Sequence, residues 1–185
     1  MPTAAFQHTN NIDSHQAHTV MGVHVPGMHW EGRYALALCT NMLGGPGMNS
    51  RLNVALRERR GLVYTVEAAT SLMSDCGLTT IYYGCDPEDN KRCMRLVNAE
   101  LQRLAATPLT HRALDAAKRQ YIGQLAISSD NKESLTLATA RATLYYGKAA
   151  TSQQSIEHIR AITPTQLQEV ATLLATAPQR VLTLT

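Results

Sequence analysis

Strand-like and helix-like segments are segregated along this chain, and that order constrains the fold more than any other feature. Alternating apolar residues rich in β-branched and aromatic types predict strands near the start and in a hairpin, with one closing strand at the end. Apolar residues at helical spacing fill most of the remainder. Segregation of this kind favours an α+β domain, with helices packed on a mainly antiparallel sheet. The predicted strands span 17–25, 62–73, 78–85 and 180–184.

The length fits one domain that spans residues 1–185, with residues 1–14 as a poorly ordered lead-in. Residues 30–43 are apolar nearly all round, which predicts a buried helix. A second, more polar helix runs from residue 49 or 50 to Arg60 and ends at Gly61. Three further helices are predicted from apolar positions three and four apart: Met94, Val97, Leu101 and Leu104; Leu114, Ala117, Tyr121 and Leu125; and Leu135, Ala138, Ala142 and Tyr145, the last ending at Gly147.

Two helix starts carry capping patterns. Asp86-Pro87 has the pattern of an N-cap residue followed by proline at the first helical position. Thr163-Pro164-Thr165-Gln166 is a capping box with proline in the first turn. Both patterns predict where the chain enters a helix.

Composition and charge exclude several classes of protein. A hydrophobic fraction of 44% with a net charge of +3 excludes a disordered chain. No apolar run approaches the roughly 18 residues of a membrane span, and no basic, aromatic-interleaved motif indicates nucleic-acid binding. Arg51, Arg57, Arg59 and Arg60 are typical of a solvated helix face. The start lacks a signal peptide, but the sequence can be a piece of a longer protein, so bacterial cytoplasm and periplasm both stay open.

Candidate metal and phosphate sites are incomplete. His15 and His18 are half of a possible zinc site that no carboxylate or cysteine at suitable spacing completes. Residues 154–158 match the inverted zincin motif H-x-x-E-H except that Gln154 replaces the first histidine, which would leave the ion one ligand short. Residues 44–47 (G-G-P-G) lack the Gly-Lys-Ser/Thr ending of a phosphate loop, so a tight turn with close backbone approach is favoured.

The cysteines indicate no metal or redox motif. Cys39, Cys76, Cys85 and Cys93 contain no C-x-x-C pair. A bridge between Cys76 and Cys85, which flank a predicted strand, is conceivable, but we expect all four to be reduced and structural.

A series of short motifs resembles the pitrilysin-type zinc metallopeptidases, or inverzincins, which include insulin-degrading enzyme and the mitochondrial processing peptidases. Residues 43–66 read L-G-G-P-G-M-N-S-R-L-N-V-A-L-R-E-R-R-G-L-V-Y-T-V, similar to the family's L-G-G-G-x-S-S-R-L and R-E-x-x-G-L-x-Y-x-V. Further matches follow in order at 75–78, 85–88, 117–125, 144–147 and 162–167. The resemblance covers about residues 15–185, nearly the whole chain.

The resemblance implies the C-terminal domain of such a peptidase, which lacks the metal motif. Residues 33–43 would correspond to the family's zinc helix, and Tyr34, Ala35, Leu36, Ala37 and Leu38 there offer no ligands, so this chain is expected to bind no zinc and to be inactive alone. Zinc would lie in an N-terminal partner domain, in the same polypeptide or a separate subunit. The two would close like a clamshell around an unfolded peptide and hydrolyse it. The alternative is a non-catalytic scaffold or assembly module of the same family.

The resemblance also implies two site residues, Arg57 and Tyr64. The family's C-terminal domain contributes an arginine and a tyrosine that reach toward substrate carbonyls at the partner's zinc. A guanidinium and a phenol would stabilise the charge that develops on an attacked carbonyl oxygen. The simpler interpretations are a solvated Arg57 and a Tyr64 that alternates with Leu62 and Val66 in the sheet core. We expect the functional role for both.

Overall fold

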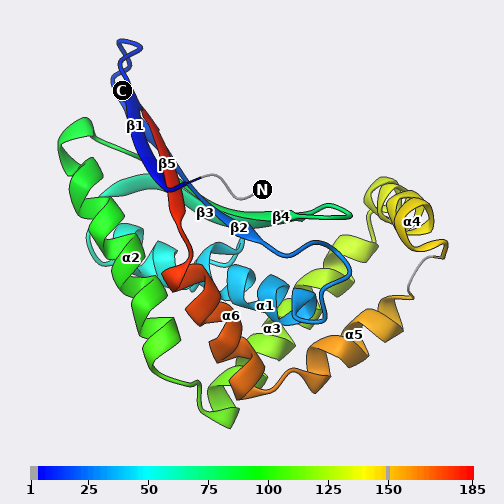
Figure 1. Ribbon diagram of the computed structural model, residues 1–185. Helices are drawn as coiled ribbons and strands as arrows, with labels where there is room; N and C mark the ends of the chain where they lie inside the picture. Colours follow the sequence, from blue (N-terminus) through cyan, green and yellow to red (C-terminus); the bar gives the residue numbers. More distant parts are fainter. Residues whose placement is uncertain (1–3, 149–150) are drawn as a thin grey trace.

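The chain folds as a sheet with helices gathered on one of its faces (Figure 1). The computed structural model describes residues 4–148 and 151–185. The strands are β1 (Phe6–Asn10), β2 (Ala17–Val25), β3 (Val63–Leu72), β4 (Gly77–Cys85) and β5 (Gln179–Leu184). The α-helices are α1 (Arg33–Gly44), α2 (Asn90–Ala106), α3 (His111–Ser129), α4 (Lys132–Tyr146), α5 (Ser152–Ala161) and α6 (Pro164–Thr176). Two shorter helices are η1 (Asn53–Glu58) and η2 (Pro87–Asp89).

The sheet has five strands in the order β1-β5-β2-β4-β3. Only β1 and β5 pair in parallel; β5, β2, β4 and β3 pair antiparallel. The expected α+β class with a mainly antiparallel sheet is confirmed. Within the described ranges, no helix combines the length and the apolar character that a bilayer crossing requires.

Alternation along the strands explains which face the helices cover. Met21, Val23 and Val25 of β2 are buried, whereas Val20 and His24, which point to the opposite face, are exposed. These buried side chains face the helix layer, where α6 contacts β2 and α1 contacts β3. Most apolar residues of α1 are buried, as the all-round apolar sequence predicts. The fully buried residues of α1 are Leu36, Leu38, Cys39 and Leu43.

Several predicted elements are confirmed. The strand 17–25 matches β2, the hairpin matches β3 and β4, and the closing strand matches β5. Thr163 caps α6 through a complete capping box, and Gly147 ends α4 with a φ of 73°. Each of these signals is local in the sequence, which is why the sequence predicts them well.

Three segments differ from the expectation. The lead-in contains β1, which pairs with β5 from the other end of the chain. The second helix continues as η1, a π-helix, so its turns are wider than those of an α-helix. In α4 the helix is present but none of its residues is buried. Of its predicted apolar positions, Leu135, Ala138 and Ala142 instead line a groove of about 500 Å³ beside α3 and α5.

The turn after α1 confirms a close backbone approach. A Cβ atom on Gly44 would lie 2.5 Å from the backbone nitrogen of Ala68 in β3, too close for any other residue. The glycine therefore allows α1 to lie directly against β3.

A pair of substitutions tests this approach. We expect Gly44→Ala to lower the free energy of unfolding by about 1–3 kcal/mol, because neither backbone can move away cheaply. Gly123→Ala is the matched control: it lies within α3 with no atom near its added Cβ, and we expect a gain of about 0.5–1 kcal/mol. Urea unfolding measures both, and equal effects would contradict the close approach.

Candidate functional site

A β-bulge in β3 turns Tyr64 out of the sheet. Val63 pairs with Cys85 and Thr65 with Gly84, so Tyr64 has no partner residue in β4. The bulge shifts the alternation: Val63 and Val66 are buried, and the two residues between them are exposed. The Tyr64 side chain is 54% exposed. This geometry excludes the interpretation of Tyr64 as a sheet core residue, and bulges of this kind often re-aim a side chain near a site.

The Tyr64 hydroxyl has a charged acceptor. It donates a hydrogen bond of 2.7 Å to Oδ1 of Asp86, the residue that follows the last residue of β4. Asp86 occupies the N-cap position of η2, but its side chain makes no capping hydrogen bond. The sequence pattern thus predicts the position of Asp86 correctly and its role wrongly. Its carboxylate binds the phenol, a long-range contact that no local pattern shows.

This contact raises the pKa of Tyr64 above its ordinary value of 10.0, first through the hydrogen bond to Asp86 and second through the negative charge of that carboxylate. Tyr64 is therefore a proton donor throughout the neutral pH range. Since the raised pKa belongs to the folded state, the contact stabilises the fold fully below about pH 10 and is lost as the pH rises through the folded-state pKa of Tyr64.

The phenol titration can be measured directly. The tyrosinate absorbance of the wild type minus that of Tyr64→Phe isolates Tyr64 from the six other tyrosines of the seven in the chain. We expect the midpoint to lie above the ordinary tyrosine value and to fall in Asp86→Asn, because the charge that opposes ionisation is gone. An unchanged midpoint in Asp86→Asn would contradict the contact.

Arg57 lies near the end of η1, and its side chain is exposed. The turn that leads from η1 into β3 is closed by hydrogen bonds from Gly61 N–H to the Arg57 carbonyl at 2.8 Å and from Leu62 N–H to the Leu56 carbonyl at 2.9 Å. Gly61 has a φ of +59°, a left-handed conformation that glycine adopts readily. This short turn fixes the backbone that carries Arg57 relative to the bulge that carries Tyr64.

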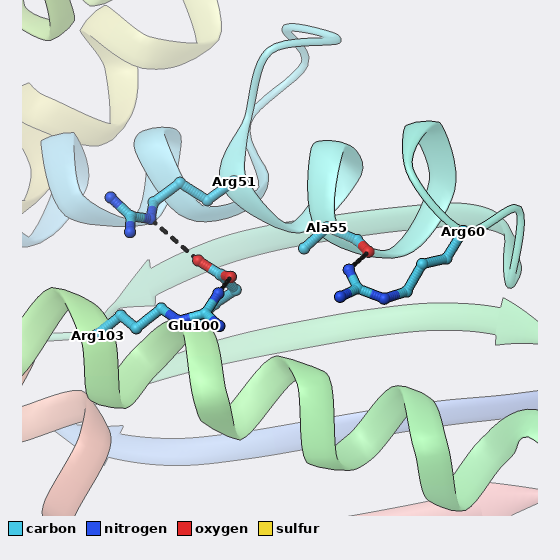
Figure 2. A network of polar contacts seen from close by, with 5 residues as sticks. All are labelled: Arg51, Ala55, Arg60, Glu100 and Arg103. Carbon is cyan, nitrogen blue, oxygen red and sulfur yellow. Dashed lines mark hydrogen bonds and ion pairs between the residues drawn. The ribbon is translucent and has the colours of Figure 1, made fainter.

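The other arginines of the basic cluster are mostly engaged (Figure 2). Arg51 donates to Glu100 at 3.3 Å, and Arg103 donates to the other oxygen of the same carboxylate. Arg60 donates to the Ala55 carbonyl at 2.6 Å. Arg59 lines a surface cavity of about 240 Å³ beside this network.

Arg57 differs from Arg51 and Arg60. Its guanidinium makes no hydrogen bond or ion pair with any residue in 4–148 or 151–185, and the same is true of Arg59. A cation without a partner among these residues can bind an acceptor from outside; of the two, Arg57 begins the short turn that leads to Tyr64.

The part of the chain that the structure describes contains no group of three or more His, Cys, Asp or Glu side chains arranged to hold a metal. At the position of the family's zinc helix, α1 buries Leu36 and Leu38, which cannot coordinate an ion. His18 has another partner, since its Nδ1 lies 2.8 Å from the Tyr82 hydroxyl. Zinc therefore does not fit these residues.

The inverted-motif segment has structural contacts as well. Gln154 completes a capping box with Thr151 at the start of α5. His158 stacks on Tyr34 of α1 with ring centroids 4.4 Å apart. These side chains help to hold α5 against α1.

Cys39, Cys76, Cys85 and Cys93 are free thiols. Cys76 precedes β4 and Cys85 ends it, and a strand of nine residues spans about 30 Å. A disulfide needs Cα atoms within about 7 Å, so the conceivable Cys76–Cys85 bridge is excluded. Cys39 is fully buried, and this burial raises the pKa of its thiol to about 12.

Comparison with known proteins identifies the family of this chain. A family model described as "Peptidase M16 inactive domain" matches residues 3–121. A Mycobacterium tuberculosis protein named "uncharacterized zinc protease" is 33% identical over 159 residues, which cover 86% of this chain and 36% of that protein. A probable mitochondrial-processing peptidase subunit alpha-2 of Arabidopsis thaliana is 25% identical, covering 93% of this chain and 36% of the subunit.

Solved structures share the fold. The crystal structure of a peptidase M16 inactive domain from Pseudomonas fluorescens superposes with a TM-score of 0.81 at 20% identity, over 99% of this chain and 43% of that one. The present chain thus spans well under half the length of the relatives it matches. The family model matches more than half of the residues of this chain. The chain therefore belongs to the peptidase M16 family and corresponds to the domain described there as inactive.

Proposed function

We propose that this chain is the substrate-binding C-terminal half of a zinc metalloendopeptidase. The observation that carries the proposal is the pair of exposed side chains Arg57 and Tyr64, a cation without a partner among the described residues and a phenol turned outward by a bulge. They lie at opposite ends of one short, hydrogen-bonded turn. The names of the curated relatives, which describe zinc proteases, support the same class of reaction.

In this proposal the H-x-x-E-H motif lies in an N-terminal partner domain, where zinc would activate the attacking water. The residues of the present chain contact the substrate and bind no zinc. Tyr64 donates its hydroxyl proton in a hydrogen bond to the substrate carbonyl oxygen, and Arg57 adds positive charge beside it. The interactions of both groups with the carbonyl oxygen strengthen as that oxygen gains negative charge. The two residues therefore stabilise the transition state more than the bound peptide. The substrate class is an unfolded peptide held in the chamber between the two halves.

A complementation assay tests the proposal. The chain alone, the zinc-bearing domain of the same polypeptide or neighbouring reading frame alone, and the two mixed with zinc are each given an unfolded peptide. We expect the mixture to cleave the peptide and each half alone to leave it intact. Cleavage by the zinc-bearing domain at the same rate without this chain would contradict the proposal.

A non-catalytic scaffold is the second candidate, and the description of the matched family domain as inactive favours it. The same assay separates the two functions. A scaffold would bind its partner without changing any rate of peptide cleavage, whereas a substrate-binding half changes that rate on mixing.

A further inference from the structure

Tyr64 and Asp86 form an exposed donor–acceptor pair at one end of the sheet. The hydroxyl-to-carboxylate distance is 2.7 Å, and both residues are exposed. Within residues 4–148 and 151–185 the Asp86 carboxylate makes no other hydrogen bond and no ion pair. Since Asp86 is exposed, its carboxylate is open to a donor from outside the chain.

A phenol has one proton, which limits what this pair can do. If Tyr64 donates to a substrate carbonyl, it can no longer donate to Asp86. The carboxylate then loses its only side-chain partner within the described residues, at the moment when bound substrate excludes water from it. An ionised group left without a donor in such a place is costly. A productive complex therefore needs a second donor for Asp86.

An extended peptide residue supplies that donor. In an extended chain the N–H and C=O groups of one residue point to the same edge, as in the hydrogen-bonded pairs of an antiparallel ladder. Such a residue can accept from Tyr64 with its carbonyl oxygen and donate to Asp86 with its own N–H. One internal hydrogen bond is then replaced by two hydrogen bonds to substrate, and no polar group stays unpaired.

We propose that Asp86 is a specificity-determining substrate contact. Its carboxylate accepts a hydrogen bond from the backbone N–H of the substrate residue that contributes the carbonyl group of the cleaved peptide bond. The inference rests on the proposed function and adds a substrate preference to it. A residue without an N–H, such as proline or an N-methyl amino acid, leaves the Asp86 carboxylate unpaired and is disfavoured at that position.

The local backbone supports this role. Cys85 pairs with Val63, so Tyr64 and Asp86 flank the last pair of the β3–β4 ladder. Asp86 is extended, with φ −65° and ψ 142°, and Pro87 restricts the backbone of Asp86, the residue before it, to this extended region. The carboxylate is thus placed by the sheet rather than by a loose loop. The raised pKa of Tyr64 keeps the phenol protonated, so the exchange of partners moves hydrogen bonds without a net proton transfer.

The test compares two peptides that differ only by an N-methyl group on the residue that contributes the scissile carbonyl. kcat/KM is measured in the mixture of this chain with its zinc-bearing half, for the wild type, Asp86→Ala and Asp86→Asn. Glu88→Gln is the matched control, an exposed carboxylate two residues away in η2. Circular dichroism of each variant checks that it is folded.

We expect N-methylation to lower kcat/KM about 10- to 100-fold more in the wild type and in Glu88→Gln than in Asp86→Ala, the range for a hydrogen bond to a charged group. Asp86→Asn, which keeps an acceptor oxygen without the charge, should fall between them. An equal factor in wild type and Asp86→Ala would overturn the role of Asp86. A wild-type mixture that cleaves neither peptide would instead contradict the proposed function, and the role of Asp86 with it.

Discussion

Replacing Tyr64 with phenylalanine is expected to lower kcat of the reconstituted peptidase by about 100-fold, with KM nearly unchanged. The substitution removes one hydroxyl from an exposed ring and leaves the bulge and the buried Val63 and Val66 in place. The loss should fall on kcat because the hydrogen bond strengthens only as the carbonyl oxygen becomes charged. Peptide cleavage rates over a range of substrate concentrations measure both constants.

Arg57→Ala should lower kcat by a comparable factor of about 100, since it removes the second group aimed at the same charge. Arg59→Ala is the control, because Arg59 lies two residues away and lines the cavity beside Glu100 instead. We expect near wild-type rates for Arg59→Ala. Equal losses at Arg57 and Arg59 would indicate a general effect of positive charge and would contradict the assigned role.

Asn90→Ala is expected to lower the free energy of unfolding by about 2–4 kcal/mol. The Asn90 carboxamide oxygen accepts from Thr19 at 2.9 Å and from the Tyr83 hydroxyl at 2.8 Å, and its nitrogen donates to Thr183 at 3.3 Å. These three partners lie in β2, β4 and β5 and are almost fully buried. The alanine variant removes the shorter of the two acceptors of the Tyr83 hydroxyl and leaves it only the backbone carbonyl of residue 90, at 3.4 Å.

The exposed pair of Asn49 and Gln120 provides a matched control. Asn49 also makes two side-chain hydrogen bonds, at 2.7 and 3.0 Å, but in contact with water. Water replaces its partner after substitution, so Asn49→Ala should cost under about 1 kcal/mol. Urea unfolding measures both variants. Similar losses in the free energy of unfolding would contradict the larger stabilisation expected from the buried network.

The sequence predicts most of the elements because their signals are local. The capping box at Thr163, the stop at Gly147 and the alternation in β2 each depend on residues within a few positions. The parallel pairing of β1 with β5 depends instead on residues from opposite ends of the chain. No short-range pattern contains that pairing, so the lead-in shows no strand signal that the sequence alone would favour.

The candidate site illustrates the same limit. The family resemblance implies Arg57 and Tyr64 as site residues, but composition and periodicity do not. The alternation of Leu62, Tyr64 and Val66 even favours a buried ring. The bulge that reverses this arises from the register between β3 and β4. The sequence predicts Asp86 as a helix cap because an N-cap aspartate often precedes a proline at the first helical position. Its carboxylate instead accepts from Tyr64, 22 positions away.

The central claim is that this chain stabilises the charged oxygen of a substrate bound at its partner's zinc. The most direct measurement is the inhibition constant of a phosphinic peptide, which mimics the tetrahedral intermediate, beside the KM of the matched ordinary peptide. For Tyr64→Phe we predict an inhibition constant raised by about 100-fold and a KM close to that of the wild type. An inhibition constant and a KM that both stay at their wild-type values would contradict the claim.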